Sequence, residues 1–199
     1  MRRITWDKVA GFGGVALAVI LAAAAGLMLW GSAYIHNEVR TQLASQQVYF
    51  PPAAAFAHPK AGTEITPSMI PSVSQYAGQQ MLTGQQAEAY ADHFIAVHLT
   101  EIGGGKTYAQ LSAASLASPK NTALAAQVQT VFRGDTLRSM LLSAFGWWKV
   151  SQIAYIASLA VFGLAALALG TGLTGFALAR RESHATITRH TSRTAPQAA

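Results

Sequence analysis

The chain has 199 residues, which leaves room for about one domain, and it lacks cysteine, which excludes disulfides, thiolate metal sites and cysteine nucleophiles. Hydrophobic residues make up 51% of the chain and charged residues 11%, whereas soluble domains carry roughly 25% charged residues. This composition indicates a chain that is partly surrounded by lipid. Five of the six net positive charges belong to the two ends, while residues 36–151 hold seven basic and six acidic residues, which excludes the basic stripe of a nucleic-acid-binding face.

The chain begins with a short basic segment, residues 1–8, followed by 27 uncharged residues at positions 9–35. A helix of that length extends about 40 Å, enough to cross a hydrocarbon core of about 30 Å with some tilt. Because backbone groups in lipid must be hydrogen-bonded within their own segment, we predict a transmembrane helix over 9–35. A cleaved signal peptide with its cleavage site at Gly31-Ser32-Ala33 is the alternative, but its apolar core would span only about 7–15 residues.

Residues 36–149 follow, and we predict that they form a helical domain. The helix of the first span continues past residue 35 and stops before Pro51-Pro52, because proline lacks a backbone donor and disfavours helical backbone in the residue before it. An irregular connector over 51–67 and a short helix over 72–81 come next.

Two Thr-x-x-Gln patterns predict the next helix starts, since such a pair caps the first turn reciprocally. The pairs are Thr83 with Gln86 and Thr107 with Gln110. We expect the first helix to cover 84–102 and the second to reach about Ala117. Asn121 then caps a last helix over 122–146, which leads into the second span and which Gly134 can bend.

A second stretch of 30 uncharged residues, 150–179, predicts the second transmembrane helix, and 180–199 is predicted to be a basic, disordered cytoplasmic tail. Lysine and arginine gather on the cytoplasmic side of membranes, so their surplus at both ends places both termini in the cytoplasm and 36–149 outside. The sequence thus predicts an all-α, multi-pass protein of the plasma membrane, in contact with the lipid bilayer. Aromatic residues expected at the outer interface are Trp30, Tyr34, Trp147, Trp148 and Tyr155.

Small residues recur every four positions in both predicted spans, and such stripes let helix backbones approach closely in lipid. The candidate packing residues are Gly14, Ala18, Ala22 and Gly26 in the first span and Ala166 and Gly170, followed by Thr174, in the second. The stripes predict that the spans pair with each other, with another membrane subunit or in a homo-oligomer. The alternative is a chance recurrence in alanine-rich helices.

His98 and Glu101 are the most interesting polar residues of the helix 84–102. His98 falls on an apolar stripe, and Glu101 follows three residues later, so the two side chains can touch. They are candidates for a proton-handling pair or for two ligands of a metal ion. Two ligands do not make a metal site, however, and the others would have to come from His36 or His58. A buried histidine held by one hydrogen bond is the favoured interpretation.

The string Gly103-Gly104-Gly105-Lys106-Thr107 resembles a phosphate-binding loop only in part. In that motif a strand leads into the loop and the first glycine stands where this chain has Thr100, whereas here a helix leads in. We therefore expect a helix end, and neither nucleotide nor nucleic acid as a partner. No serine-nucleophile motif is present either, so we expect no catalytic residue and no cofactor.

Several segments resemble a group of uncharacterised two-span membrane proteins of actinobacteria, and the likeness covers roughly residues 30–170. The segments that carry it are Tyr90–Leu99, Glu101–Tyr108, Gln127–Arg138 and Ala144–Trp148. Some members of the group carry the label of aromatic ring-opening dioxygenase, which the residues here do not support, because no set of two histidines and a carboxylate for iron is evident.

Three functions remain open from the sequence. The first is an accessory, scaffolding or interaction subunit whose outer domain binds a partner at the cell surface. The second is an extracytoplasmic sensor that couples a ligand or pH, through His98 and Glu101, to the membrane helices. The third is a metal-dependent enzyme using the same two residues, for which the ligand count is inadequate.

Overall fold

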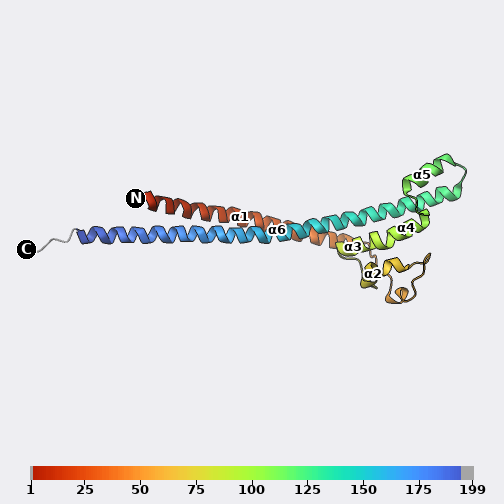
Figure 1. The fold of residues 1–199 in the computed structure, drawn as a ribbon, viewed down its shortest axis with the longest axis horizontal. Helices are drawn as coiled ribbons and strands as arrows, with labels where there is room; N and C mark the ends of the chain where they lie inside the picture. The colour runs from red at the N-terminus through yellow and green to blue at the C-terminus, as the bar shows by residue number, and fades with distance from the viewer. Residues whose placement is uncertain (1, 194–199) are drawn as a thin grey trace, which may run out of the picture. The chain divides into compact units, whose positions relative to one another are not determined.

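The structure, a computed structural model, describes the backbone of residues 2–193 and the side chains of residues 6–181. Every regular element in this part of the chain is a helix, and the one β contact there is an isolated antiparallel bridge between Tyr49 and Gln80. Two helices are long: α1 (Arg2–Ser45) near the N-terminus and α6 (Thr122–Arg193) in the second half of the chain (Figure 1). The prediction of an all-helical chain is confirmed.

Both long helices contain a segment that is long and apolar enough to cross a membrane, Trp6–Ser45 in α1 and Thr122–Arg181 in α6. The rest of the chain covers little of either segment, since only 11% and 17% of the residues in their most apolar windows are buried. A helix that is apolar all round needs either a large protein core or lipid around it. Since no such core covers them, these two helices are the candidate membrane spans.

The chain divides into two compact units, which we name the apolar unit and the middle domain. The apolar unit comprises Met1–Ser32 and Ile153–Ala199, so it consists of the first part of α1 and the last part of α6. The middle domain comprises Ala33–Gln152 and contains all of the other elements.

In the apolar unit, α1 and α6 pack through buried small residues that recur every seven positions. These residues are Gly11, Ala18, Ala25 and Ser32 on α1 and Ser158, Ala165, Gly172 and Ala179 on α6. A seven-residue repeat keeps one face of a helix turned toward its partner when the two helices wind around each other in a left-handed sense. The contact is close: a Cβ added to Gly14 would lie 2.7 Å from the backbone of Gly172.

The four-residue stripes of the sequence analysis lie partly on this packed face. Gly14 and Ala18 are on it, while Ala22 and Gly26 are half-buried. On α6, Ala166 and Gly170 are exposed, and the packed face is instead formed by the seven-residue repeat. The physical reason is that four residues turn a helix by about 400°, so a stripe of that period drifts by about 40° at each step, whereas a seven-residue repeat drifts much less.

The middle domain begins with short turns rather than with long helices. They are η1 (Ala53–Phe56), η2 (Pro67–Met69), α2 (Ile70–Val73) and η3 (Ser74–Tyr76). The short helix expected over 72–81 is therefore placed earlier and broken into pieces. Proline at the start of both η2 and α2 fixes the backbone there, and Gly78 then turns the chain with a φ of 70°.

Both predicted capping boxes are present. The hydroxyl of Thr83 accepts a hydrogen bond from the Gln86 backbone N–H at the start of α3 (Gly84–Tyr90), and the Gln86 side chain accepts one from the Thr83 N–H. Thr107 and Gln110 do the same at the start of α5 (Tyr108–Ala117). At the start of α6, the Asn121 side chain accepts a hydrogen bond of 3.0 Å from the Leu124 N–H.

The helix expected over 84–102 is not one uninterrupted α-helix. After α3, residues Ala91–Ile95 form a π-helical segment, η4, and α4 (Ala96–Gly103) completes it. A π turn adds one residue to the helix and rotates everything after it. As a result, the predicted apolar stripe is buried at its start and exposed at its end. Ala87 and Ala91 are fully buried, whereas Ile102 is 41% exposed.

The core of the middle domain combines side chains from α1, from the segment 50–81 with its short helices η2 and α2, and from α3, η4 and α6. Its buried members are Val39, Leu43, Phe50, Ile65, Met69, Val73, Met81, Ala87, Ala91, Leu141 and Trp148. A smaller cluster of Leu111, Val128 and Val131 lies between α5 and α6. Gly134 permits close packing of α4 on α6, because a Cβ there would overlap the Leu99 side chain of α4.

Trp148 belongs to this core, not to the exposed aromatic set expected at the membrane interface. Only 5% of it is exposed. The imidazole of His36 covers its ring at a centroid distance of 3.9 Å, and Gly84, the first residue of α3, lies against its Cβ and Cγ. The start of α3 therefore packs against α6 at Trp148.

The tail expected to be disordered over 180–199 begins as helix, because α6 continues to Arg193, and residues 194–199 lie outside the described part. The physical reason is that extending an existing helix avoids the unfavourable nucleation step.

Candidate functional site

The two polar residues singled out by the sequence lie near each other in the chain but are engaged differently. His98 is half-buried on α4, with its ring against that of Phe94 at 4.7 Å and its Nδ1 donating to the Phe94 carbonyl oxygen at 2.8 Å. Glu101 is exposed. His58 is exposed in the connector, and His36 lies on Trp148. Among the described residues, no three histidine, aspartate or glutamate side chains come together as metal ligands would.

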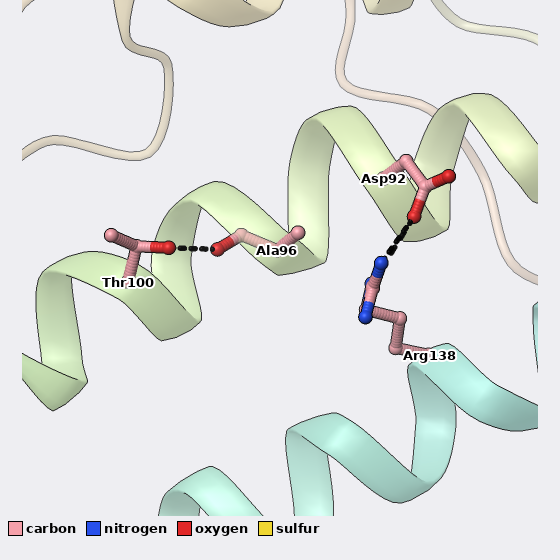
Figure 2. Close-up of polar contacts among 4 residues, drawn as sticks. All are labelled: Asp92, Ala96, Thr100 and Arg138. Carbon is pink, nitrogen blue, oxygen red and sulfur yellow. Dashed lines mark hydrogen bonds and ion pairs between the residues drawn. The ribbon is translucent and has the colours of Figure 1, made fainter. Parts of the chain in front are cut away.

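The π-helical segment is tied to α6 by an ion pair, which Figure 2 shows. The Arg138 guanidinium donates to Asp92 Oδ1 from Nη2 at 2.7 Å and from Nε at 3.2 Å. One turn further along, the Thr100 hydroxyl donates to the Ala96 carbonyl at 2.8 Å. Both charged side chains are more than a third exposed, at 38% and 35%, so solvent screens the pair and it contributes at most about 1 kcal/mol. Its role is structural.

A continuous set of aromatic rings runs from the core to His98. The centroid distances are 5.2 Å for Phe50–Tyr76, 5.4 Å for Phe50–Tyr90, 4.6 Å for Tyr90–Phe94 and 4.7 Å for Phe94–His98. Tyr90 is the middle ring of this set, between Phe50 and Phe94. Burial raises the pKa of its hydroxyl, and the negative charge of Glu64 raises that pKa further.

The raised pKa of Tyr90 predicts a loss of stability in alkali. The folded domain favours the neutral hydroxyl, so its contribution is fully present below the ordinary tyrosine pKa of about 10 and is lost as the pH rises through the higher pKa of the folded state. The unfolding midpoint of the detergent-solubilised protein should therefore fall less steeply above about pH 10 in Tyr90→Phe than in the parent protein. Tyr49→Phe is the control, because Tyr49 is 56% exposed; equal slopes for all three proteins would contradict the prediction.

A groove of about 520 Å³ lies between the parts of the two long helices that belong to the middle domain. We name it the α1–α6 groove. One wall is formed by the last turns of α1 from Val39 and by Gln46 and Val48 after it, the other is α6 from Leu137 to Trp147, and Tyr90 and Ile95 complete the lining. Its lining residues are Val39, Gln42, Leu43, Gln46, Val48, Tyr90, Ile95, Leu137, Met140, Leu141, Ser143, Ala144 and Trp147.

None of these lining residues carries a charge, and the polar side chains among them are two glutamines, a serine and a tyrosine. Three large apolar residues on the α6 wall are more than half exposed: Leu137 at 55%, Met140 at 62% and Trp147 at 56%. Contiguous exposed apolar surface of this kind marks places where proteins bind something else. The groove can bind an apolar surface, and it presents no nucleophile with an adjacent base.

The groove was missed by the sequence reasoning because its walls are separated by about ninety residues in the chain. A local signal for the α6 wall does exist. Leu137, Met140, Ala144 and Trp147 follow one another at intervals of three, four and three residues, which is the spacing of a helix face that packs against other helices. The sequence alone did not show that part of this face stays uncovered.

The glycine-rich string ends α4 and supports no phosphate loop. Gly104 and Gly105 both have positive φ, at 58° and 75°, and their N–H groups donate to carbonyls of the last turn, those of Glu101 and Thr100. The next helix start is already capped by the Thr107 side chain, which accepts from the Gln110 N–H. The backbone donors that would hold a phosphate are therefore used within the chain.

A comparison with protein-family models finds no match, and comparisons with curated proteins and with solved structures find none either.

Proposed function

We propose that this chain is a two-span protein of the plasma membrane with both termini in the cytoplasm. The middle domain then lies outside, where it serves as a non-enzymatic accessory, scaffolding or interaction module that binds a partner through the α1–α6 groove. The observation that carries the proposal is the groove itself, which is uncharged and bordered by large exposed apolar side chains.

Membrane insertion is supported by the two candidate spans and by the charges next to them. Both apolar segments are mostly uncovered by protein, and basic residues follow or precede them at the two chain ends. A retained first span, as opposed to a cleaved signal peptide, is supported by the packing of α1. Cleavage after Ala33 would remove Gly14, whose backbone lies against Gly172, and would leave the small-residue face of α6 without its partner.

Partner binding is supported by the size and chemistry of the groove. Its volume of about 520 Å³ falls within the range of roughly 300–1,000 Å³ that is typical of binding pockets. The exposed side chains on its border are of the types that dominate binding energies at interfaces, an indole and long apolar chains.

A charge placed in the groove should weaken partner binding. Met140→Glu puts a carboxylate at the most exposed apolar position of the α6 wall, and burying that charge against a partner would cost much more than the methionine contact contributes. We expect affinity for the partner to fall by at least about tenfold. The measurement is purification of the tagged full chain in a mild detergent, with the stoichiometry of co-purified protein or of the homo-oligomer determined by light scattering.

Ser139→Glu is the matched control, because Ser139 is the neighbouring exposed residue on α6 and does not line the groove. This variant should retain the partner. A parent chain that purifies as a lone monomer from membranes would count against the proposed function, as would equal retention of the partner by both glutamate variants.

A further inference from the structure

We infer that the occupant of the α1–α6 groove is the same face of a second copy of this chain, so that two copies pair through their α6 helices outside the membrane. The inference rests on the proposed function and names the partner of that site.

The first argument is that the groove and exposed side chains that can fill such a groove belong to one face of the middle domain. The α6 wall presents Leu137, Met140 and Trp147 outward, each more than half exposed, next to a hollow with apolar walls. In an interface with twofold symmetry the same patch is used on both copies, so a patch must hold both the projection and the recess. This face has both.

The second argument concerns charge. Near a twofold axis each residue faces its own counterpart, so any charged residue there would meet a like charge. The lining of the groove contains none. Its polar residues Gln42, Gln46 and Ser143 each carry both a donor and an acceptor, so each can hydrogen-bond to the identical residue of another copy. The polar chemistry is therefore self-complementary, which a partner of a different sequence would not require.

The third argument concerns register. Two copies anchored in one membrane share orientation and depth, so equivalent residues of their α6 helices lie at the same height. The stripe from Leu137 to Trp147 extends for about 15 Å along the helix, and its intervals of three, four and three residues suit knobs-into-holes packing between parallel helices. Shared anchoring also raises the effective concentration of the second copy.

The absence of cysteine from the chain makes a sharp test possible, because a single introduced cysteine has no competitor. The variants Met140→Cys and Trp147→Cys are expressed as full chains and oxidised in isolated membranes. A disulfide requires Cβ atoms about 3.5–4.5 Å apart, so it reports close pairing. We expect both variants to give a reducible species at twice the 21.0 kDa of one chain. Ser139→Cys, which replaces an exposed hydroxyl outside the groove, should give little or none.

Each outcome decides between the possibilities. A doubled mass from Met140→Cys and Trp147→Cys, and not from Ser139→Cys, supports pairing with a second copy. Equal cross-linking by all three reflects random collision and overturns the inference. A reducible adduct of another mass identifies a different protein as the occupant, which overturns this inference and leaves the proposed function standing. If no adduct forms and the parent chain is a monomer in mild detergent, this inference and the proposed function are both overturned.

Discussion

Gly84→Ala is expected to destabilise the middle domain more than any other single methyl group added to it. The new Cβ would overlap the Cβ and Cγ of Trp148, and that indole cannot move aside because it is buried and covered by His36. Forcing an extra methyl into a well-packed core typically costs about 1–3 kcal/mol, and the overlap here favours the upper end of that range. Thermal unfolding in detergent, followed by tryptophan fluorescence, measures the loss as a lower midpoint.

Gly146→Ala provides the matched control. Gly146 is helical, exposed and only two residues from Trp148, and a Cβ there would meet nothing within 4 Å. Alanine is the better helix former by up to about 1 kcal/mol, so this variant should unfold at the same temperature as the parent protein or above it. Equal midpoints for Gly84→Ala and the parent protein would show that α3 does not start against Trp148.

The helix starts could be read from the sequence because their causes are local. In a threonine and a glutamine three residues apart, each side chain can accept a hydrogen bond from the other residue's backbone N–H, independently of the rest of the chain. Both predicted pairs do so in the structure. The helix end at Gly103 is equally local, since it needs only the left-handed backbone of Gly104. Capping therefore fixed where α3 and α5 begin and where α4 ends.

The features that the sequence did not show depend on residues far apart in the chain. The π turn over Ala91–Ile95 accompanies the pairing of Asp92 with Arg138, 46 positions away. The burial of Trp148 depends on His36 and Gly84, and a tryptophan next to an apolar run is otherwise expected at a membrane surface. Long-range packing decided these positions, and no local pattern encodes it.

The candidate site likewise has one feature that a local sequence pattern shows and one that depends on residues far apart in the chain. His98 was recognisable from its place on an apolar stripe, and its Nδ1 donates to a carbonyl of its own helix, that of Phe94. The groove depends on the end of α1 lying opposite residues 137–147, which are far away in the chain. In the apolar unit the sequence indicated that small residues pack, whereas the period of seven emerged from which of them are buried.

Gly14→Leu is expected to separate α1 from α6 in the apolar unit. A Cβ at this position would lie 2.7 Å from the Cα and N atoms of Gly172 and 2.9 Å from the Ala168 carbonyl oxygen. These are backbone atoms of a continuous helix, so no change of side-chain rotamer can relieve the overlap and the whole helix must move. In the proposed membrane arrangement, close packing is the main force that holds the two helices together, so the loss is expected to exceed about 2 kcal/mol. Titration with a denaturing detergent, followed by the fluorescence of the tryptophans, should show unfolding at a lower detergent fraction.

Gly13→Leu tests whether that effect comes from the helix contact or from the loss of a glycine. The two positions are adjacent in α1, and a Cβ on Gly13 meets nothing within 4 Å because it points away from α6. In the proposed membrane arrangement a leucine there faces lipid, and it replaces the poorest helix former apart from proline, so the titration midpoint should stay or rise. If both variants shift the midpoint equally, the α1–α6 contact at Gly172 does not form in the membrane, and the argument that the first span is retained loses its support. If only Gly14→Leu lowers it, the two helices pair through the backbone contact at Gly14 and Gly172.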